Sequence, residues 1–300
     1  MKILVTGGTT FVSKYTAEYF LKKGNEVWVI NRNTRKQIEG INLIECERSE
    51  LGERLKEHKF DAVIDVCTYN ESQLSSLLEA LGEYNDYIFI SSSAVYPETN
   101  PQPFTEEQEC GANAVWGDYG TNKLAAEKYL QKVCPTAYIL RPPYFYGLYE
   151  NLYREAFAFD CAMADRKFYI PKNGEMKMQF FNVCDLCRFI EILLEKHPEN
   201  RIFNVGNKEA VSIKEWAELC YKAAGKTPDF VSVDKAVFQR DYFPFHDYEY
   251  YLDVTKQSNL MSETLSLEEG LKEEFDWYVN NPNSVYFKKP YVQFIESLNI

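Results

Sequence analysis

The beginning of the chain constrains its fold most strongly. The apolar run Ile3-Leu4-Val5 ends in Thr6-Gly7-Gly8-Thr9-Thr10, an amphipathic stretch follows to Lys23, and a second apolar run covers residues 26–30. A strand, a glycine turn, a helix and another strand within roughly thirty residues form a βαβ unit. Because a helix connects the two strands, they are expected to run parallel. The sequence therefore predicts a parallel sheet at the start of the chain.

The same alternation continues through the first half of the chain. Strands are expected at 42–44, 61–66 and 87–90, and helices at 51–58 and 71–81. Alternation of this kind is typical of a parallel sheet with helices on both faces. The predicted fold class is α/β, with a Rossmann-type doubly wound parallel sheet.

The pattern loosens in the second half of the chain. The segments 146–178 and 208–300 are richer in Tyr, Phe, Pro and charge, whereas residues 201–206 again resemble a strand and a turn. We therefore expect two lobes. Residues 1–145 plus about 179–207 form the predicted dinucleotide-binding Rossmann domain, and 146–178 plus 208–300 form a smaller C-terminal α/β substrate lobe.

Composition and charge exclude several classes of protein. With 45% hydrophobic residues, the 300-residue chain can bury a substantial core, which excludes a disordered protein. A net charge of −12 argues against a nucleic-acid partner, because such proteins bind phosphates through Lys and Arg. No apolar run approaches the roughly 20 residues of a membrane span, and the first apolar run is too short for a signal peptide. We expect a cytoplasmic protein without nucleic-acid or membrane partners.

The cysteines and histidines do not indicate a metal site. The eight cysteines are scattered without a framework spacing, and the three histidines lie far apart. Cys184 and Cys187 form a CxxC pair, but no second pair follows at zinc-ribbon spacing. We interpret this pair as buried thiols at the start of a helix, and no metal is predicted.

The glycine turn after the first strand is a candidate phosphate-binding site. Gly7 and Gly8 permit a tight turn, and the following helix aims backbone N–H groups and the positive end of its dipole at one point, which suits a pyrophosphate. At the end of the second strand, NAD enzymes usually present an acid to the adenosine ribose. Here Asn31 would not repel a 2′-phosphate, and the Arg32 guanidinium would bind it or stack on adenine. The sequence therefore favours NADP over NAD.

Tyr119 and Lys123 are the candidate proton-transfer pair. Their spacing places a phenol and an ammonium one helical turn apart on one face, and a nearby cation favours the phenolate. Tyr19 and Lys23 have the same spacing without a catalytic context, so the spacing alone is not specific. The context of Tyr119 is the preceding strand, which ends in Ser91-Ser92-Ser93 at the sheet edge where ligands bind. A serine hydroxyl there can bind the substrate oxygen while the phenolate takes its proton.

Several motifs spread over nearly the whole chain identify a family when they are taken together. They are Thr6-Gly7-Gly8-Thr9-Thr10-Phe11-Val12, Ser91-Ser92-Ser93-Ala94-Val95-Tyr96, Tyr119 with Lys123, Arg141-Pro142-Pro143-Tyr144-Phe145-Tyr146-Gly147, and Phe203-Asn204-Val205-Gly206. These residues resemble the extended short-chain dehydrogenase/reductase superfamily, in particular the NAD-dependent epimerase/dehydratase group that works on nucleotide sugars. The resemblance implies hydride exchange between a nicotinamide and a sugar carbon. Tyr119 would be the acid/base, Ser92 the catalytic serine, and Lys123 the residue that holds the nicotinamide ribose.

The resemblance also implies which residues contact the two ligands. The cofactor contacts are Gly7, Gly8, Thr9, Thr10, Phe11, Val12, Asn31, Arg32, Glu47, Cys67, Thr68, Ser91, Tyr119, Lys123 and Pro142. The substrate contacts are Ser93, Tyr144, Lys177 and Arg154. Lys177 and Arg154 are candidates to replace an arginine that often binds the substrate diphosphate in nucleotide-sugar enzymes, because Met178 occupies its place here.

Two departures from the family's pattern bear on function. Thr10 and Ser13 stand where the family's TGxxGxxG motif has glycines, which would weaken or re-pose the cofactor. Ser93 and Ala94 replace the Asp-Glu pair of sugar 4,6-dehydratases, which disfavours dehydration. The favoured function is therefore an NAD(P)-dependent epimerase or oxidoreductase acting on a nucleotide-linked sugar.

A second class of function stays open. Gly7-Gly8-Thr9, Asn31-Arg32 and Phe243-Pro244-Phe245-His246-Asp247 resemble a divergent branch related to the chloroplast stem-loop RNA-binding proteins. The alternative is a catalytically silent protein of the same fold that senses dinucleotides or associates with RNA. The retained Tyr119 and Lys123, together with the acidic charge, favour the enzyme.

Two expectations concern larger segments. The aromatic stretch 238–251 either closes over the substrate as a lid or packs the small lobe. Members of the superfamily commonly dimerise through the helix that carries the Tyr/Lys pair and the helix before it. We therefore expect a homodimer whose contact involves the helices near 71–82 and 119–133.

Overall fold

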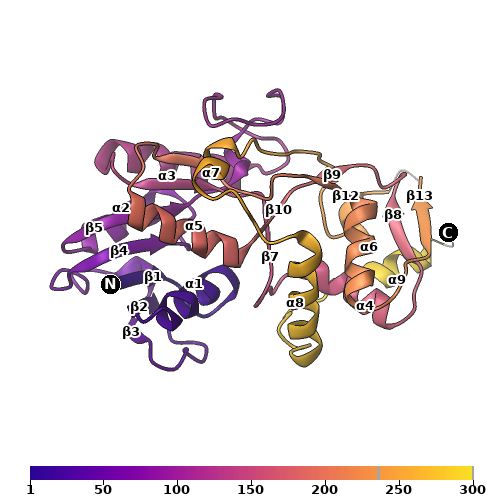
Figure 1. The fold of residues 1–300 in the computed structure, drawn as a ribbon, viewed down its shortest axis with the longest axis horizontal. Coiled ribbons are helices and arrows are strands. Elements are labelled where there is room, and N and C mark those ends of the chain that lie inside the picture. The colour runs from indigo at the N-terminus through magenta and orange to yellow at the C-terminus, as the bar shows by residue number, and fades with distance from the viewer. Residues whose placement is uncertain (235–236, 299–300) are drawn as a thin grey trace.

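The computed structural model describes residues 1–234 and 237–298, and its largest element is a seven-stranded sheet. The strands are β1 (Lys2–Thr6), β2 (Glu26–Asn31), β3 (Asn42–Glu45), β4 (Phe60–Asp65), β5 (Tyr84–Ile90), β6 (Tyr138–Arg141) and β11 (Ile202–Asn204). Their order is β11-β6-β5-β4-β1-β2-β3, and all neighbours pair in parallel (Figure 1). The strand order reverses at β1, which is the point where open α/β sheets bind ligands. The predicted fold class is confirmed.

Helices cover both faces of this sheet (Figure 1). On one face α1 (Phe11–Lys22) packs against α5 (Val183–Lys196), and on the other α2 (Glu71–Ala80) packs against α3 (Asp118–Val133). The central strand β1 shows why the apolar runs are unbroken. Ile3 and Val5 belong to the apolar cluster of the first face, and Leu4 belongs to that of the second.

The connection from β3 to β4 differs from the prediction. The sequence predicted a helix over 51–58, but the structure has the 3-10 turn η1 (Arg48–Glu50) followed by turns and an isolated bridge at Leu55. Gly52 has a φ of +52°, a left-handed conformation that does not continue a helix. Leu51 and Leu55 have the i, i+4 spacing of a helix face, but both are buried in the core of the second face from a segment of turns, so the prediction was wrong.

A second, smaller lobe lies beside the first (Figure 1). Its elements are α4 (Glu155–Met163), β8 (Phe168–Pro171), β9 (Lys177–Met178), β12 (Val211–Ser212), α6 (Ile213–Ala223), β13 (Phe230–Val233), η3 (Gln239–Asp241), α8 (Leu267–Asn280) and α9 (Tyr291–Ser297). β8 pairs in parallel with β13, and β9 pairs in antiparallel with β12. The lobe has an aromatic core in which Phe159, Trp216 and Phe243 are fully buried. The smaller α/β lobe agrees with the sequence, whereas its exact boundaries stay a prediction.

A short parallel pair joins the two lobes (Figure 1). It consists of β7 (Tyr144–Tyr146) and β10 (Phe180–Asn182). The connection from β7 to α4 passes this junction, which brings Arg154 close to both lobes. The other described elements are η2 (Ser93–Val95) and α7 (Thr255–Leu260). Within the described ranges, no helix is both long and apolar enough to cross a membrane.

Candidate active site

The glycine turn between β1 and α1 has the shape that a phosphate site requires. Gly7 and Gly8 have φ values of +91° and +92°, and the Gly7 N–H donates to the Ile30 carbonyl at 3.0 Å. A Cβ on Gly7 would lie 2.7 Å from the Cys67 Sγ, and one on Gly8 would lie 2.4 Å from the Val29 Cγ1. Both positions therefore need glycine for backbone conformation and for packing.

The two departures in this turn, Thr10 and Ser13, have different surroundings. Thr10 is the N-cap residue of α1, and within the described part of the chain its side chain makes no capping hydrogen bond. The Ser13 hydroxyl donates to the Thr10 carbonyl at 2.9 Å, so this buried polar group is satisfied. The first N–H groups of α1 are thus left without a side-chain cap, which suits an anionic ligand.

A long groove runs along the carboxyl ends of the strands in two connected parts. One part has a volume of about 400 Å³ and lies beside the ends of β1 and β2, and the other has about 370 Å³ and extends to the end of β5. The two parts share Thr10, Cys67 and Tyr69. The predicted cofactor residues that line them are Gly7, Thr9, Thr10, Phe11, Val12, Asn31, Arg32, Glu47, Cys67, Ser91, Tyr119, Lys123 and Pro142. The residues present therefore fit a dinucleotide.

Two predicted cofactor residues lie behind the groove rather than in its wall. Gly8 packs against Val29, as its close approach requires. Thr68 is fully buried, and its carbonyl accepts a hydrogen bond from the Lys123 Nζ at 2.6 Å. Both residues shape the groove through packing and through the position of Lys123.

At the end of the groove beside β2, Asn31 and Arg32 differ in their contacts. The Asn31 carboxamide donates to the Gly7 carbonyl at 2.7 Å and accepts from the Asn33 N–H at 2.8 Å. Asn31 therefore fixes the glycine turn. The exposed Arg32 has its Nε 3.9 Å from the Glu47 Oε2, and a pair that is so exposed and so long binds weakly.

A close contact between α3 and η2 positions Tyr119 and Ser92. A Cβ on Gly120 would lie 2.3 Å from the Ala94 carbonyl oxygen, so only glycine allows this approach. Ser92 is the N-cap of η2, and its hydroxyl accepts from the Ala94 N–H at 3.1 Å. Tyr119, one residue before Gly120, lines the same two cavities as Ser92. Serine and tyrosine, predicted from separate motifs, are therefore brought together.

Lys123 lies one turn further along α3 and is almost completely buried. Its Nζ donates to the carbonyls of Thr68 at 2.6 Å and Ile90 at 2.8 Å. Burial lowers the pKa of Lys123 to about 8. Burial also raises the pKa of Tyr119, and the neighbouring Ser92 hydroxyl opposes this rise.

A further cavity of about 420 Å³ adjoins the groove on the side of the small lobe. Ser92 and Tyr119 line both this cavity and the nearer part of the groove. The predicted substrate residues Ser93, Tyr144 and Arg154 line it as well. The junction of groove and cavity is therefore the place where a cofactor and a second ligand would meet at Tyr119.

One of the predicted substrate contacts is not brought to this cavity. Lys177 is exposed on β9, and its backbone N–H donates to the Glu249 carboxylate at 2.8 Å. Lys177 lies outside the described cavities because β9 turns Met178 into the core of the small lobe and leaves its neighbour in solvent. The prediction of Lys177 as a substrate contact is therefore not supported by its position.

Arg154 lines the cavity but already has strong partners. It forms ion pairs with the buried Glu150 and Glu155, and it also donates to the Phe145 carbonyl. Its guanidinium lies 5.7 Å from the Tyr144 ring centroid. The carboxylates hold Arg154 in place and neutralise most of its charge.

Sequence reasoning missed part of the cavity wall. Trp116, Arg240, His246 and Tyr250 also line it. Arg240 donates to the carbonyls of Phe243 and Pro244, and no carboxylate among the described residues forms an ion pair with it. Burial, together with the charges of Arg240 and Lys289, lowers the pKa of His246.

The signal for these missed residues is the aromatic stretch 238–251. The core packing is confirmed for part of the stretch, and the closing lid stays a prediction. Phe243 and Phe245 are buried in the core of the small lobe, whereas His246 and Tyr250 line the cavity.

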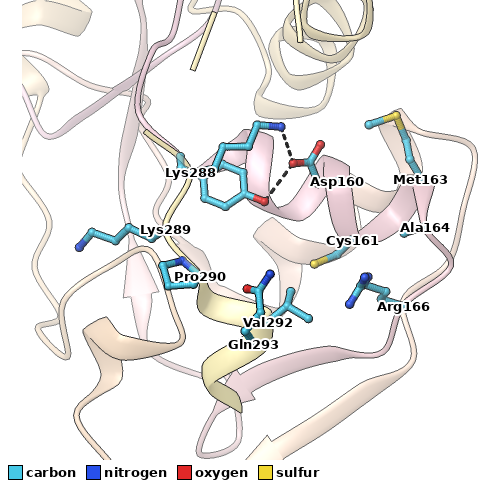
Figure 2. A pocket seen from close by; sticks show the side chains of 11 residues that line it. Asp160, Cys161, Met163, Ala164, Arg166, Lys288, Lys289, Pro290, Val292 and Gln293 are labelled. Atoms are coloured by element: carbon cyan, nitrogen blue, oxygen red, sulfur yellow. Dashed lines mark hydrogen bonds and ion pairs between the residues drawn. The ribbon is translucent and has the colours of Figure 1, made fainter. Parts of the chain in front are cut away.

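Another cavity, of about 490 Å³, lies in the small lobe between α4 and the start of α9 (Figure 2). In Figure 2 the Lys288 ammonium points at the Asp160 carboxylate, and the two lie 2.7 Å apart. The hydroxyls of Tyr153 and Tyr278 donate to the same carboxylate at 2.9 and 2.8 Å. This cavity shares no lining residue with the one at Tyr119. Its charged groups are paired, because Asp160 binds Lys288 and both tyrosine hydroxyls.

The fold and this site define a Rossmann-type α/β protein with a serine, a tyrosine and a lysine gathered beside a dinucleotide groove. The chain belongs to the NAD dependent epimerase/dehydratase family, whose model matches residues 3–206.

Individual proteins resemble this chain in sequence or in fold. The chloroplast stem-loop binding protein of 41 kDa b of Arabidopsis thaliana is 26% identical over 298 residues, which cover 92% of this chain and 76% of that one. A trifunctional UDP-glucose 4,6-dehydratase of the same plant is 26% identical over 222 residues, or 71% of this chain, which spans only 32% of its length. The solved UDP-glucuronic acid 4-epimerase of Bacillus cereus, in complex with UDP-glucuronic acid and NAD, has a TM-score of 0.73 at 22% identity and covers 94% of this chain and 100% of its own. At that identity it supports the fold alone.

Proposed function

We propose that the protein is an NAD(P)-dependent epimerase or oxidoreductase that acts on a nucleotide-linked sugar by hydride transfer, with Tyr119 as acid/base. One observation carries the proposal: Ser92 and Tyr119, which come from separate motifs, line both the groove and the adjoining cavity. A substrate hydroxyl that reaches Tyr119 would therefore also be next to the nicotinamide end of the groove.

The roles of the residues follow from their surroundings. The cofactor, when bound, accepts and returns a hydride. Tyr119 takes the proton of the substrate hydroxyl as the hydride leaves its carbon, and it returns the proton in the reverse step. Ser92 shares a hydrogen bond with that oxygen and limits the rise of the Tyr119 pKa. Lys123 is held by two carbonyls, which leaves its third N–H for the cofactor ribose.

We also propose NADP rather than NAD as the preferred cofactor. The end of β2 carries a neutral amide and Arg32 where an acid would repel a 2′-phosphate, and Arg35 lines the same part of the groove. Arg32→Ala is expected to weaken NADP binding roughly 10- to 100-fold, since a hydrogen bond to a charged group contributes about 1.5–3 kcal/mol. NAD binding should stay unchanged. Arg54→Ala, which removes a charge outside the groove, is the matched control. Equal weakening of both dinucleotides would contradict the preference.

The nucleotide-sugar substrate is supported by the lining of the cavity. Arg240 carries a charge without a carboxylate partner among the described residues, and it lines the cavity together with the aromatic rings of Trp116, Tyr144 and Tyr250. A ligand that carries both a phosphate and sugar or base rings would match these groups.

The first experiment is to denature freshly purified protein and to identify any released dinucleotide by mass spectrometry. Retained NAD favours an epimerase, which regenerates its cofactor in every cycle. A protein that binds added NADP reversibly favours a reductase, which exchanges it. Failure to bind either dinucleotide would overturn the proposal and would mean that Thr10 and Ser13 close the site.

A binding protein without chemistry is the second candidate. It is favoured by the 26% identity with a chloroplast stem-loop binding protein over 92% of this chain. The net charge of −12 opposes RNA binding. A stem-loop RNA binding assay at physiological salt separates the two, since we expect no binding. Tight binding together with an inert Tyr119 would favour the second candidate.

The assembly and the compartment are part of the proposal as well. We propose a cytoplasmic homodimer whose contact involves α2 and α3, which pack side by side in the structure. Light scattering in solution should give twice the chain mass of 35.0 kDa, and a monomer at all concentrations would contradict this.

A further inference from the structure

Arg48, which no sequence motif singled out, occupies a central place in the groove. It is the first residue of η1, lines the adenosine end of the groove, and has a side chain that is 24% exposed. Its Nη2 donates to the Thr68 hydroxyl and lies 3.5 Å from the Asp65 Oδ1. Arg48 therefore connects the adenosine end to residues at the carboxyl end of β4.

Asp65 is a fully buried carboxylate at that end of β4. It accepts hydrogen bonds from the Thr6 hydroxyl and the Tyr87 hydroxyl, both at 2.8 Å. Neutral donors satisfy its lone pairs but not its charge. Arg48 supplies the opposite charge at 3.5 Å, in surroundings where an unpaired carboxylate is strongly disfavoured.

Thr68 joins this pair to the catalytic lysine. Its hydroxyl accepts from Arg48, and its carbonyl accepts from the Lys123 Nζ at 2.6 Å. The second acceptor for Lys123 is the Ile90 carbonyl at 2.8 Å. Loss of the Arg48 side chain would therefore release Thr68, whose carbonyl holds the Lys123 ammonium.

The carboxylates around Lys123 form ion pairs with arginines and not with the lysine. The groups that act on it are Asp65 and Cys67 from the end of β4, Glu127 from α3 and Arg48 from η1. Glu127 forms a buried ion pair with Arg141 at 2.6 Å, and Asp65 forms an ion pair with Arg48. Burial raises the pKa of the Cys67 thiol, which keeps it neutral. Among the residues described, no carboxylate forms an ion pair with Lys123, so its charge stays available.

We propose that Arg48 is a positioning residue for Lys123: by holding Thr68 and neutralising Asp65, it keeps the lysine on the two carbonyls beside Tyr119 and prevents it from pairing with Asp65. This inference rests on the proposed function, in which Lys123 acts at the nicotinamide ribose. Without Arg48, the long and flexible lysine side chain turns toward the nearest uncompensated carboxylate.

The test is the titration of the Lys123 ammonium in the cofactor-free protein, followed by NMR with labelled lysine and assigned with a Lys123→Met sample. Arg48→Met removes the charge and the hydrogen bond, and we expect the Lys123 pKa to move upward from about 8 because Asp65 then favours the cation. Arg48→Lys should restore most of the wild-type value. Arg54→Met, which removes a charge from the same segment without touching Thr68 or Asp65, should leave the titration unchanged.

Further variants keep the test decisive if Arg48→Met does not fold. Asp65→Asn alone should lower the Lys123 pKa, and adding it to Arg48→Met should return the titration toward the wild-type value. An unchanged Lys123 titration in these variants would overturn the proposal, as would a loss of NAD or NADP affinity in Arg48→Met without any shift of Lys123. Because the titration involves neither cofactor nor substrate, it can succeed even where the proposed reaction fails.

Discussion

Gly120→Ala tests whether the contact between α3 and η2 positions Tyr119. The added Cβ would lie 2.3 Å from the Ala94 carbonyl oxygen, so the helix must retreat by about 1.1 Å to reach ordinary contact at 3.4 Å. Such overpacking costs about 1–3 kcal/mol, and the better helix propensity of alanine offsets about 1 kcal/mol of it. We expect the free energy of unfolding to fall by only about 0–2 kcal/mol.

The effect of Gly120→Ala on turnover should be larger than its effect on stability. A shift of about 1 Å separates Tyr119 from Ser92, and misplacement of that size lowers rates roughly 100-fold. The assay combines urea unfolding with turnover of the UDP- or dTDP-sugar that the wild-type protein converts fastest. Thr121→Ala, on the exposed side of the same helix, should change neither quantity. Wild-type turnover in Gly120→Ala would refute the role of this contact.

Three further predictions concern the side chains of Glu274, Arg240 and Lys177. Burial and the nearby Glu155 and Glu150 hold the pKa of Glu274 well above its ordinary value, so its ionisation destabilises the fold as the pH rises through the folded-state pKa. Glu274→Gln should therefore lose less stability than the wild type as the pH rises above the unfolded-state pKa of about 4.3 in urea titrations; equal losses would contradict this. Arg240→Met should raise the substrate KM roughly 10- to 100-fold, the equivalent of a charged hydrogen bond, while Lys177→Met should leave the KM unchanged. The reverse order in steady-state kinetics would show that Lys177 is the substrate contact after all.

The fold was predictable where local pattern and tertiary role agree. The strand, glycine turn and helix from Lys2 to Lys22 follow from apolar runs and from two glycines whose positive φ the turn requires. The prediction for segment 51–58 was wrong because Leu51 and Leu55, although spaced as on a helix face, are buried from consecutive turns. In such short connections, packing against the sheet overrides helical periodicity.

The candidate site was predictable from strand ends but not from long-range contacts. Ser92 and Tyr119 come from separate motifs, and sheet topology places both at one edge. Arg240 reaches the same cavity from a segment more distant in the chain, and no local pattern records that approach. The exposure of Lys177 depends on a single-residue register, because β9 buries Met178 and leaves its neighbour in solvent, and its role stays a prediction. Arg48 was missed because its importance lies in its contacts with Thr68 and Asp65.

The most direct measurement is a comparison of Tyr119→Phe with Tyr129→Phe, a matched variant on the same helix whose hydroxyl contacts Ser75 outside the groove. For each variant, dinucleotide affinity and hydride transfer to or from the nucleotide sugar are measured together. We expect Tyr119→Phe to lower hydride transfer by roughly 10²- to 10⁴-fold while binding the dinucleotide nearly as well as the wild type, because only proton transfer is lost. Tyr129→Phe should behave as the wild type. Undiminished hydride transfer in Tyr119→Phe would contradict the assignment of Tyr119 as the acid/base.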